Sequence, residues 1–426
     1  MRHDFRHGYV ERVVDDQIET LLPHLPALLL DGPKAVGKTR TAEQRAATTW
    51  YLHRPAVAQV VAADPELAMR APAPVLFDEY QRVEHLWDEV KHLVDRDPTP
   101  GRVLLTGSEP PHGAHSGAGR IPSVRMRPLT LPERGVCAAT VSLRGLLDGD
   151  TRIGGSSPLR LQDYVDLILQ SGLPGLQHLS GVPLATQLDG YIERIIDRDL
   201  PEAGLKVRRP ATLKAWMAAY AAAVATPTAW EKIRDAATPG QGNKPAKTTT
   251  LPFIDTLTQL RILDELPAWS TGRSHLNRLT QAPKHHLADP ALAARLVGVT
   301  RASLLQGAGS TFTPNDGTYL GQLFESLATM SVRVFAGPPG AEVSHLRLEG
   351  GRHEVDLIVE RGDDRAIVAF EVKLAAGVAD KDVDHLRWLR EKLGDRLVDA
   401  VVLTTGEHAY RRPDGIAVVP LALLGP

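Results

Sequence analysis

The sequence predicts an α/β fold, a parallel sheet with helices on both faces, followed by a helical middle region and a C-terminal α+β domain. Three apolar runs of strand length carry the first part of this prediction, at 27–30, 75–77 and 102–105. Each run ends in a polar turn, and helix-forming residues fill the stretches between the runs. Such alternation favours parallel strands joined by helical crossovers.

The turn after the first run contains a complete phosphate-binding loop. Its pattern, G-x-x-x-x-G-K-[ST], is made by Gly32, Pro33, Lys34, Ala35, Val36, Gly37, Lys38 and Thr39. In such a loop the backbone N–H groups point inward at phosphate, and the helix that follows adds its positive end. The lysine reaches the β- and γ-phosphates, and the threonine hydroxyl holds Mg²⁺. The loop therefore predicts nucleotide binding, with a catalytic contribution from Lys38.

The second strand ends in two acidic residues, Asp78 and Glu79. A carboxylate at this strand end lies beside Thr39 in a phosphate-loop fold, so Asp78 is expected to complete the Mg²⁺ shell. Glu79 is then placed to orient or deprotonate the water that attacks the γ-phosphate. We interpret Glu79 as the catalytic carboxylate.

The third strand ends in Thr106, Gly107 and Ser108. A hydroxyl here is placed to contact the γ-phosphate and the attacking water. A hydrogen-bonded turn after a buried strand explains the same residues equally well. Both interpretations of Thr106 and Ser108 stay open at the level of sequence.

Composition is that of an ordinary globular protein. A length of 426 residues is enough for two or three domains. The residues are 43% hydrophobic and 23% charged, which is ordinary for a globular protein. A net charge of −2 argues against a protein that coats nucleic acid generally. The single cysteine, Cys137, excludes a disulfide framework or a multi-cysteine metal site and fits a reducing compartment. No apolar run reaches membrane-spanning length and no secretory leader precedes the fold, so a cytoplasmic location is expected.

The segments 78–83 (Asp-Glu-Tyr-Gln-Arg-Val), 102–108 (Arg-Val-Leu-Leu-Thr-Gly-Ser), 119–120 and 127–133 resemble a family of prokaryotic AAA-type ATPases. The resemblance covers nearly the whole chain, and the family's C-terminal half is largely uncharacterised. Members usually have Arg-Gln where this chain has Lys34 and Ala35, positions that phosphate chemistry does not require. The resemblance implies ATP, bound with Mg²⁺, as the nucleotide.

The same resemblance implies that an arginine from a neighbouring copy completes the site, and hence a homo-oligomer. Arg120, in a glycine-rich loop, is the candidate by position, although a surface arginine is the plainer interpretation. Arg194 and Arg198 are candidates for a second nucleotide sensor. Both also fit ordinary helical ion pairs, and we favour that interpretation.

The predicted domain boundaries follow composition. Residues 1–148 form the nucleotide domain, 149–158 a Gly- and Ser-rich linker, 159–209 a helical lid-like segment, and 210–300 a winged-helix-like module. Between 201 and 290 twelve basic residues face seven acidic ones, a net charge of +5. This charge allows sequence-independent contact with DNA, while docking on a protein is about as plausible. His285 and His286 are interpreted as a polar surface pair.

Residues 301–426 change to an α+β pattern. A helix is expected over 319–334, strands over 354–359, 366–373 and 399–403, and a second helix over 380–393. This order resembles the restriction-endonuclease-like fold, with its Asp…Glu-x-Lys signature. The resemblance implies Asp356 and Glu371 as Mg²⁺ ligands, Lys373 as the group that positions water, and Glu325 as an auxiliary carboxylate.

Three functions follow from these observations. The first is an ATP-hydrolysing protein that acts on DNA or a DNA-bound complex. The second is an ATP-switched module that docks on a protein partner and carries an inactive nuclease-like domain. The third is a Mg²⁺-dependent DNA nuclease that ATP gates. No membrane partner is expected in any of them.

Overall fold

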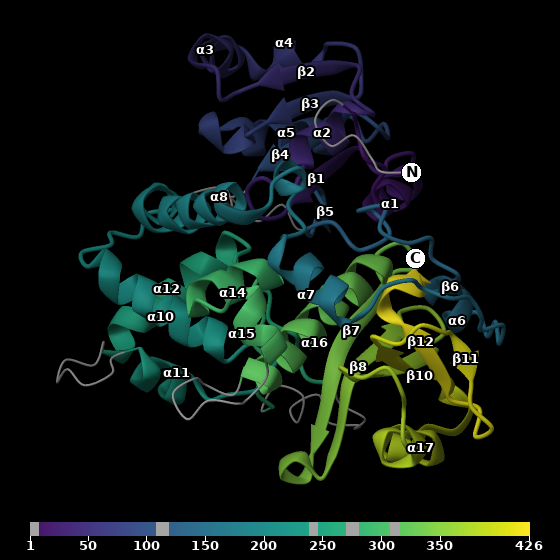
Figure 1. Cartoon of the computed structure of the whole chain (residues 1–426). Coiled ribbons are helices and arrows are strands. Elements are labelled where there is room, and N and C mark those ends of the chain that lie inside the picture. Colours follow the sequence, from purple (N-terminus) through teal and green to yellow (C-terminus); the bar gives the residue numbers. More distant parts are fainter. Residues whose placement is uncertain (1–7, 108–118, 238–245, 270–280, 307–315) are drawn as a thin grey trace.

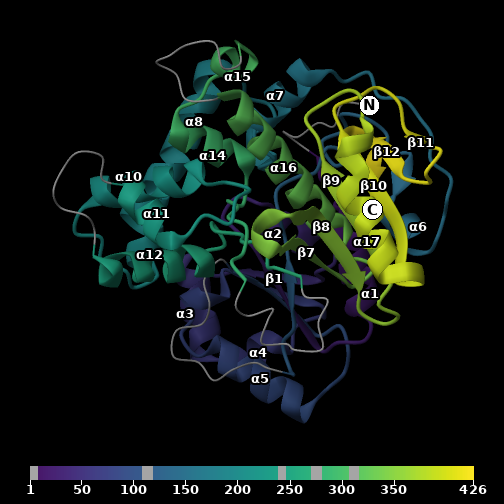
Figure 2. The same cartoon turned by 90° about the horizontal axis from the view of Figure 1, so that it is seen from below.

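The computed structural model describes residues 8–107, 119–237, 246–269, 281–306 and 316–426. An N-terminal domain lies above two other units, a group of helices from the middle of the chain and a C-terminal sheet (Figure 1). Seen from below, these two units lie side by side (Figure 2).

The N-terminal domain is built on a parallel sheet with the strand order β2-β3-β4-β1-β5. Because β1 lies between β4 and β5, the loop that follows it is at the carboxyl edge of the sheet, beside the end of β4. Its strands are β1 (Ala27–Asp31), β2 (Thr48–Tyr51), β3 (Val75–Asp78), β4 (Val103–Gly107) and β5 (Ser123–Arg125).

Helices cover both faces of this sheet. Its strands are apolar along their length, and successive side chains point to opposite faces, so both faces are apolar. Leu28 and Leu30 pack with Ile18 of the first helix, while Ala27 belongs to a second cluster with Trp87 on the opposite face. The helices are α1 (Val13–Leu21), α2 (Lys38–Glu43), α3 (Pro55–Ala63), α4 (Pro65–Met69) and α5 (Leu86–Arg96). The predicted parallel sheet flanked by helices is confirmed.

The segment after this domain crosses to the C-terminal sheet. It forms β6 (Val141–Ser142) and α6 (Leu143–Leu147), whose leucines lie in the core shared with that sheet. Residues 155–157, in the predicted linker, hydrogen-bond to the backbone of residues 407–409.

The middle of the chain is helical. Its elements are α7 (Leu161–Leu169), α8 (Gly181–Arg194), a π-helical turn (Ile195–Asp199), α9 (Leu200–Glu202), α10 (Pro210–Ala222), α11 (Trp230–Ala236), α12 (Lys247–Gln259), α14 (Pro290–Val297) and α15 (Arg301–Gln306). Trp216 stacks on Tyr220 and on Trp230, with ring centroids 5.7 and 6.2 Å away.

After α12 the chain makes a short antiparallel ladder, in which Leu263 lies opposite Leu287 and Leu266 opposite Lys284. Three helices followed by a ladder are the parts of the predicted winged-helix-like module, which stays a prediction.

The C-terminal domain is a mixed sheet with the order β11-β12-β10-β9-β8-β7, covered by α16 and α17. The elements are α16 (Asp316–Phe335), β7 (Ala341–Leu348), β8 (His353–Arg361), β9 (Ile367–Val372), α17 (Asp384–Leu393), β10 (Leu397–Thr404), β11 (Tyr410–Arg411) and β12 (Ala417–Pro420). Strand β7 had no counterpart in the prediction. The predicted α+β character is confirmed, and the endonuclease-like assignment stays a prediction.

Short 3-10 turns complete the chain, at Tyr80–Arg82, Pro174–Leu176, Glu349–Gly351, Asp380–Val383, Gly394–Arg396 and Leu421–Leu423. A final strand, β13 (Leu424–Gly425), pairs with β6, and Ser142 donates a hydrogen bond to the carbonyl of Pro426. None of the helices in the described ranges is both long and apolar enough to cross a membrane.

Candidate functional site

The phosphate-binding loop connects the interior strand β1 to helix α2. Gly32 approaches the backbone so closely that a Cβ there would lie 2.5 Å from the carbonyl oxygen of Met126. Gly37 has a φ of 103°, in the left-handed region that glycine adopts without strain. Both glycines of the motif are therefore required by the local backbone.

Lys38 lies folded across this loop. Its ammonium donates hydrogen bonds to the carbonyl oxygens of Gly32 (2.8 Å) and Pro33 (2.9 Å), and only 6% of the residue is exposed. Burial lowers the pKa of Lys38 to about 8, against the opposing effect of Glu79 and Asp31. A poorly solvated ammonium beside open backbone amides is suited to binding polyphosphate.

A pH dependence of nucleotide binding follows from this pKa. A bound triphosphate favours the charged ammonium, so ATP affinity should stay constant below pH 8 and fall above it, by up to about tenfold per pH unit. Calorimetric titration between pH 7 and 9.5, in two buffers of different protonation enthalpy, should show proton uptake on binding above pH 8.

The control for this dependence is Lys38→Arg, whose guanidinium stays charged throughout the range. Its affinity should be lower than that of the wild type but independent of pH. A wild-type affinity that is also flat up to pH 9.5 would contradict the proposed role of the ammonium.

The carboxyl ends of β3 and β4 bring three oxygen-bearing side chains together. The Thr39 hydroxyl donates to Oδ1 of Asp78 (2.6 Å), and the Thr106 hydroxyl donates to the same oxygen (2.7 Å). Asp78 and Thr106 are buried, at 3% and 1% exposure. Hydroxyl and carboxylate oxygens are the ligands that Mg²⁺ prefers, with phosphate and water completing its shell. Thr39 and Asp78 thus fit the predicted Mg²⁺ site, and Thr106 fixes the carboxylate.

Glu79 follows directly and has a left-handed backbone, with φ 59° and ψ 50°. This conformation is costly for a residue with a Cβ, so the surrounding structure must hold it in place. Its carboxylate accepts a hydrogen bond of 2.7 Å from Nε2 of Gln81. Glu79 also lines the pocket at the loop, as a catalytic carboxylate there would have to.

A pocket of about 660 Å³ opens beside the loop. Besides loop residues and Glu79 its walls include Tyr9, Val10, Leu129 and Pro174. The volume and the apolar side walls suit a purine base next to the phosphates.

The phosphate loop is tied to the helices of the middle region. Lys34 forms an ion pair of 2.7 Å with Asp199, at the end of the π-helical turn, and its carbonyl accepts a hydrogen bond from the Tyr191 hydroxyl. Arg198 pairs with Glu202 at 3.0 Å, four residues along the helix. This is the ordinary helical ion pair that we favoured for it. Arg194, at the end of α8, makes no ion pair with the phosphate loop among the described residues.

Two residues predicted to be catalytic, Arg120 and Ser108, are not found at the phosphate-binding loop in the described structure. Arg120 forms an ion pair with Asp95 of its own chain and does not line the pocket at the loop. Ser108 falls outside the described residues. The source of a completing arginine stays a prediction.

A buried arginine that the sequence analysis did not identify, Arg12, hydrogen-bonds to the backbone of the phosphate-binding loop. Arg12 donates to the carbonyl oxygens of Val36 (2.9 Å) and Arg127 (2.7 Å) and forms an ion pair with Glu133. Glu133 belongs to the 127–133 segment that carried the family resemblance. No local pattern marks Arg12, because its partners are 24 to 121 residues away.

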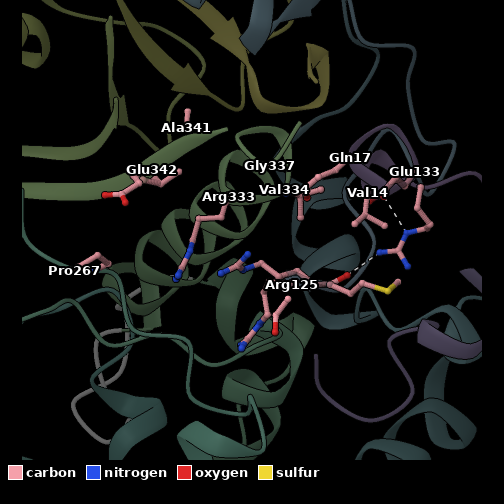
Figure 3. Close-up of a pocket in the computed structure, with 15 residues that line it drawn as sticks. Val14, Gln17, Arg125, Glu133, Pro267, Arg333, Val334, Gly337, Ala341 and Glu342 are labelled. Carbon is pink, nitrogen blue, oxygen red and sulfur yellow. Dashed lines mark hydrogen bonds and ion pairs between the residues drawn. The ribbon is translucent and has the colours of Figure 1, made fainter. Parts of the chain in front are cut away.

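Next to Arg12 a second pocket of about 430 Å³ lies where the N-terminal domain, α16 and β7 meet. Arg125 and Arg333 extend into it from different elements (Figure 3). Both belong to an ionic cluster around Asp264, whose carboxylate contacts Arg127 at 2.7 Å, Arg333 at 3.3 Å and Arg125 at 3.4 Å.

The cluster extends to the phosphate loop. Asp31, the last residue of β1, pairs with Arg261 at 2.6 Å, and Arg125 lies 3.9 Å from the same carboxylate. Burial raises the pKa of Asp264. The guanidinium groups of Arg127, Arg333 and Arg125 together lower it by more, so the pKa lies well below the usual range. Three parts of the chain thus meet directly behind the phosphate loop.

In the C-terminal domain the predicted residues converge on one place. Asp356 on β8 and Glu371 on β9 lie one residue beyond the Leu357–Phe370 pair of the antiparallel ladder. Glu325 reaches the same region from α16. Lys373 forms an ion pair of 2.9 Å with Glu371, and His385 lies 3.7 Å from that carboxylate.

An unpredicted lysine also enters this group. The ammonium of Lys284, from the middle region, lies 2.7 Å from Glu325, 3.0 Å from Asp356 and 3.2 Å from Glu354. Burial lowers the pKa of Lys284, but the three carboxylates raise it by more, so the ammonium stays charged. Burial, with Asp356 nearby, raises the pKa of Glu371.

These contacts bear on the predicted second metal site. Within the ranges that the structure describes, no group of three or more His, Cys, Asp or Glu side chains is arranged to hold a metal ion. Asp356 already accepts from the Lys284 ammonium and from the backbone N–H of Val372 (2.9 Å). Asp356 and Glu371, with Glu325, therefore do not fit a Mg²⁺ site in this arrangement.

The interpretation of His285 and His286 as a surface pair is wrong. Their exposures are 1% and 3%. His285 contacts the Thr228 carbonyl (2.7 Å) and Glu265 (3.1 Å), and His286 contacts the Ser326 hydroxyl (3.1 Å). Both rings are buried because other parts of the chain pack against the ladder, and these partners replace water at His285 and at Nδ1 of His286.

The net charge of +5 between residues 201 and 290 does not measure how many of the basic residues are exposed. Lys284 is buried among carboxylates, and Arg261 is paired with Asp31. Lys206, Arg208, Arg209, Lys214, Lys232 and Lys247 are exposed. Lys244, Arg273 and Arg278 lie outside the described residues.

Comparison with known protein families gives three matches. Residues 24–134 match the model of an AAA domain. Residues 161–303 and 320–424 match two domains of unknown function, DUF8612 and DUF4143. The N-terminal domain is thus similar to AAA domains over residues 24–134.

Two curated relatives match along most of the chain. They are the uncharacterized proteins Mb2031c of Mycobacterium bovis and Rv2008c of Mycobacterium tuberculosis, each 25% identical over 416 residues, which cover 95% of this chain and 82% of the relative. Among solved structures, the Walker-type ATPase PABY2304 of Pyrococcus abyssi aligns with 68% of this chain and 97% of its own, at 15% identity and a TM-score of 0.38.

Proposed function

We propose that this chain binds ATP with Mg²⁺ at the phosphate loop, hydrolyses it, and passes the nucleotide state to its middle and C-terminal parts. One observation carries the proposal: Lys38, Thr39, Asp78 and Thr106 meet at the carboxyl edge of the parallel sheet. This is the arrangement that nucleotide hydrolysis by a P-loop domain requires.

Each residue has a role in this proposal. The loop amides and the Lys38 ammonium bind the β- and γ-phosphates, and Thr39 and Asp78 would hold Mg²⁺, which neutralises phosphate charge when bound. Glu79, held by Gln81, orients the attacking water and accepts its proton. Thr106 keeps the Asp78 carboxylate in position.

The switching part of the proposal is supported by contacts behind the loop. Asp31 precedes Gly32 directly and pairs with Arg261, which lies three residues before Asp264. Lys34 in the loop pairs with Asp199. A shift of the loop on nucleotide binding would therefore act on both segments, and this favours an ATP-switched interaction module.

Action on DNA is the second candidate, and one specific observation favours it. Lys206, Arg208, Arg209 and Lys214 are exposed and lie close together in the sequence around the start of α10. Such a group would contact the phosphate backbone without reading sequence. Whether the natural target is DNA, a DNA-bound complex or a protein is then decided by experiment.

The test is ATP turnover by the wild type and by Glu79→Gln, with and without double-stranded DNA. The substitution keeps the shape of the side chain and removes the base, so ATP binding should persist while turnover falls by about 10²-fold. Turnover is followed by phosphate release and binding by a fluorescent ATP analogue, with the integrity of the DNA checked in the same samples.

Stimulation of the wild type by DNA would assign the DNA-directed function, and stimulation that Arg208→Ala/Arg209→Ala removes would place the contact just before α10. Turnover indifferent to DNA would leave the ATP-switched module. Equal turnover by the wild type and Glu79→Gln would contradict the role of Glu79.

A further inference from the structure

The pocket next to Arg12 collects arginine side chains from two parts of the chain. Its volume is about 430 Å³, within the range of about 300–1,000 Å³ that is typical of sites for small molecules. Arg125, at the end of β5, and Arg333, on α16, extend into it (Figure 3). Arg127 also lines it. We call this cavity the arginine pocket.

The three arginines share one carboxylate. Asp264 lies 3.4 Å from Arg125, 2.7 Å from Arg127 and 3.3 Å from Arg333. Guanidinium groups gathered around a single carboxylate repel each other, and burial leaves little water to screen them. Positive charge at this place is therefore only partly compensated by Asp264.

Arg125 has the weakest contacts of the three. Its second carboxylate neighbour, Asp31, is 3.9 Å away and is already paired with Arg261 at 2.6 Å. Nε of Arg125 is buried and has no hydrogen-bond partner in the described part of the chain. Burial and the charges of Arg127 and Arg261 lower the pKa of Arg125 to about 10, against the opposing effect of Asp264. An anion placed beside this guanidinium would stabilise it.

The other charged residues of the wall leave this excess in place. Arg12 and Glu133 form an ion pair of 2.9 Å with each other. Glu342, on β7, is exposed, so water screens its charge. Inside the pocket positive charge therefore predominates.

We propose that the arginine pocket binds the phosphate group of a small ligand between Arg125 and Arg333. A guanidinium presents its N–H donors in a planar fork that matches phosphate oxygens, and two such groups from different elements bind one phosphate from two sides. The ligand supplies the negative charge that the three arginines lack. Because it contacts both the N-terminal domain and α16, it also holds these two parts together. The inference needs neither nucleotide nor turnover, and so goes beyond ATP hydrolysis.

The experiment measures the binding of inorganic phosphate and of glycerol 3-phosphate to the full chain, without nucleotide. Isothermal titration calorimetry gives the number of sites and their affinities. The rise in melting temperature on adding each ligand, at equal ionic strength, gives an independent readout. Phosphate also fits the phosphate-binding loop, so each protein is measured with and without the additional substitution Lys38→Ala. The site in the arginine pocket should persist in Lys38→Ala.

Arg125→Met should lower the affinity of this site for phosphate at least about tenfold, because one charged donor group is lost. Without ligand its melting temperature should equal or exceed that of the wild type, since a poorly compensated buried charge is removed. A purely structural arginine would give a lower melting temperature instead.

Arg102→Met is the matched control for Arg125→Met. The Arg102 side chain is 25% exposed, against 21% for Arg125, and it pairs with Asp97 at 2.7 Å without lining the pocket. Its phosphate affinity should equal that of the wild type. Glu342→Gln should change the affinity in the opposite direction and tighten phosphate binding a few-fold, because it removes a negative charge from the wall.

The two ligands distinguish the source of the phosphate. Tighter binding of glycerol 3-phosphate would identify an organic phosphate, and tighter binding of inorganic phosphate would identify the free ion. Succinate that binds as tightly as either of them would overturn the assignment to phosphate.

Two other results would overturn the proposal. One is a phosphate affinity that neither Arg125→Met nor Glu342→Gln changes, and the other is the loss of all phosphate binding in Lys38→Ala. Should Arg125→Met fail to fold, Arg125→Lys, which keeps the charge but not the planar fork, and Glu342→Gln decide in the same way. ATP turnover that proves independent of Glu79 has no bearing on these results, so the two proposals fail separately.

Discussion

Lys38→Ala is expected to lower ATP turnover by about 10³-fold, because it removes the charge that stabilises phosphate in the transition state. The loss should exceed that of an ordinary lysine contact, since Asp31, Asp78 and Glu79 all act on this buried ammonium. Without it, three acidic groups would face an anionic ligand. The measurement is kcat/KM for ATP from steady-state phosphate release.

Lys392→Ala is a matched control, since it removes an exposed lysine on α17 in the C-terminal domain. Its kcat/KM should equal that of the wild type. A Lys38→Ala protein that keeps more than a tenth of wild-type turnover would place the phosphate contact elsewhere.

The second large effect is expected on stability. Asp264→Ala removes the carboxylate that contacts Arg125, Arg127 and Arg333. The charges of Arg127 and Arg333 are then left largely buried without their carboxylate, while Arg125 keeps only the more distant Asp31. Breaking a buried pair in this way costs about 3–5 kcal/mol of free energy of unfolding. Differential scanning calorimetry should show a lower melting temperature, with the N-terminal domain unfolding separately from the rest.

The pH dependence of this loss has a definite sign. The pKa of Asp264 in the folded protein lies well below its usual value, so the carboxylate stabilises the fold above the unfolded-state pKa. That contribution is lost only as pH falls through the depressed folded-state pKa. The difference between the wild type and Asp264→Ala should therefore be constant from pH 5 to pH 8.

Glu265→Gln provides the neighbouring control. The side chain of Glu265 is 28% exposed and lies 3.1 Å from the His285 ring, so its loss should cost about 1 kcal/mol or less. Equal destabilisation by the two substitutions would mean that the arginine cluster does not hold the domains together.

Local features of the sequence predicted which residues of the N-terminal domain lie together at the phosphate loop, while their binding of nucleotide stays a prediction. The spacing of Gly32, Gly37, Lys38 and Thr39 places them on one turn, and parallel strands bring Asp78 and Thr106 to the same edge. A motif of this kind is informative because its residues are close in the sequence, so the local backbone conformation determines their relative positions. The same reasoning confirmed the parallel sheet flanked by helices.

The long-range ion pairs could not be predicted in this way. Asp264 meets Arg125 and Arg127 across more than 130 residues, and Lys284 meets Asp356 across 72. A single sequence gives no signal for such partners, because any exposed charge has the same local pattern. His285 and His286 were misplaced for a related reason: only the tertiary ladder decides that polar rings face inward.

The contact of β13 with β6 has a consequence for the order in which the protein is made. Ser142 and its partner Pro426 are 284 residues apart in the sequence, so β6 emerges from the ribosome long before β13 exists to pair with it. The sheet of the N-terminal domain, which is complete at β5, can form during synthesis. Residues 141–147 must wait, with the leucines of α6 exposed, until the C-terminal sheet arrives to cover them.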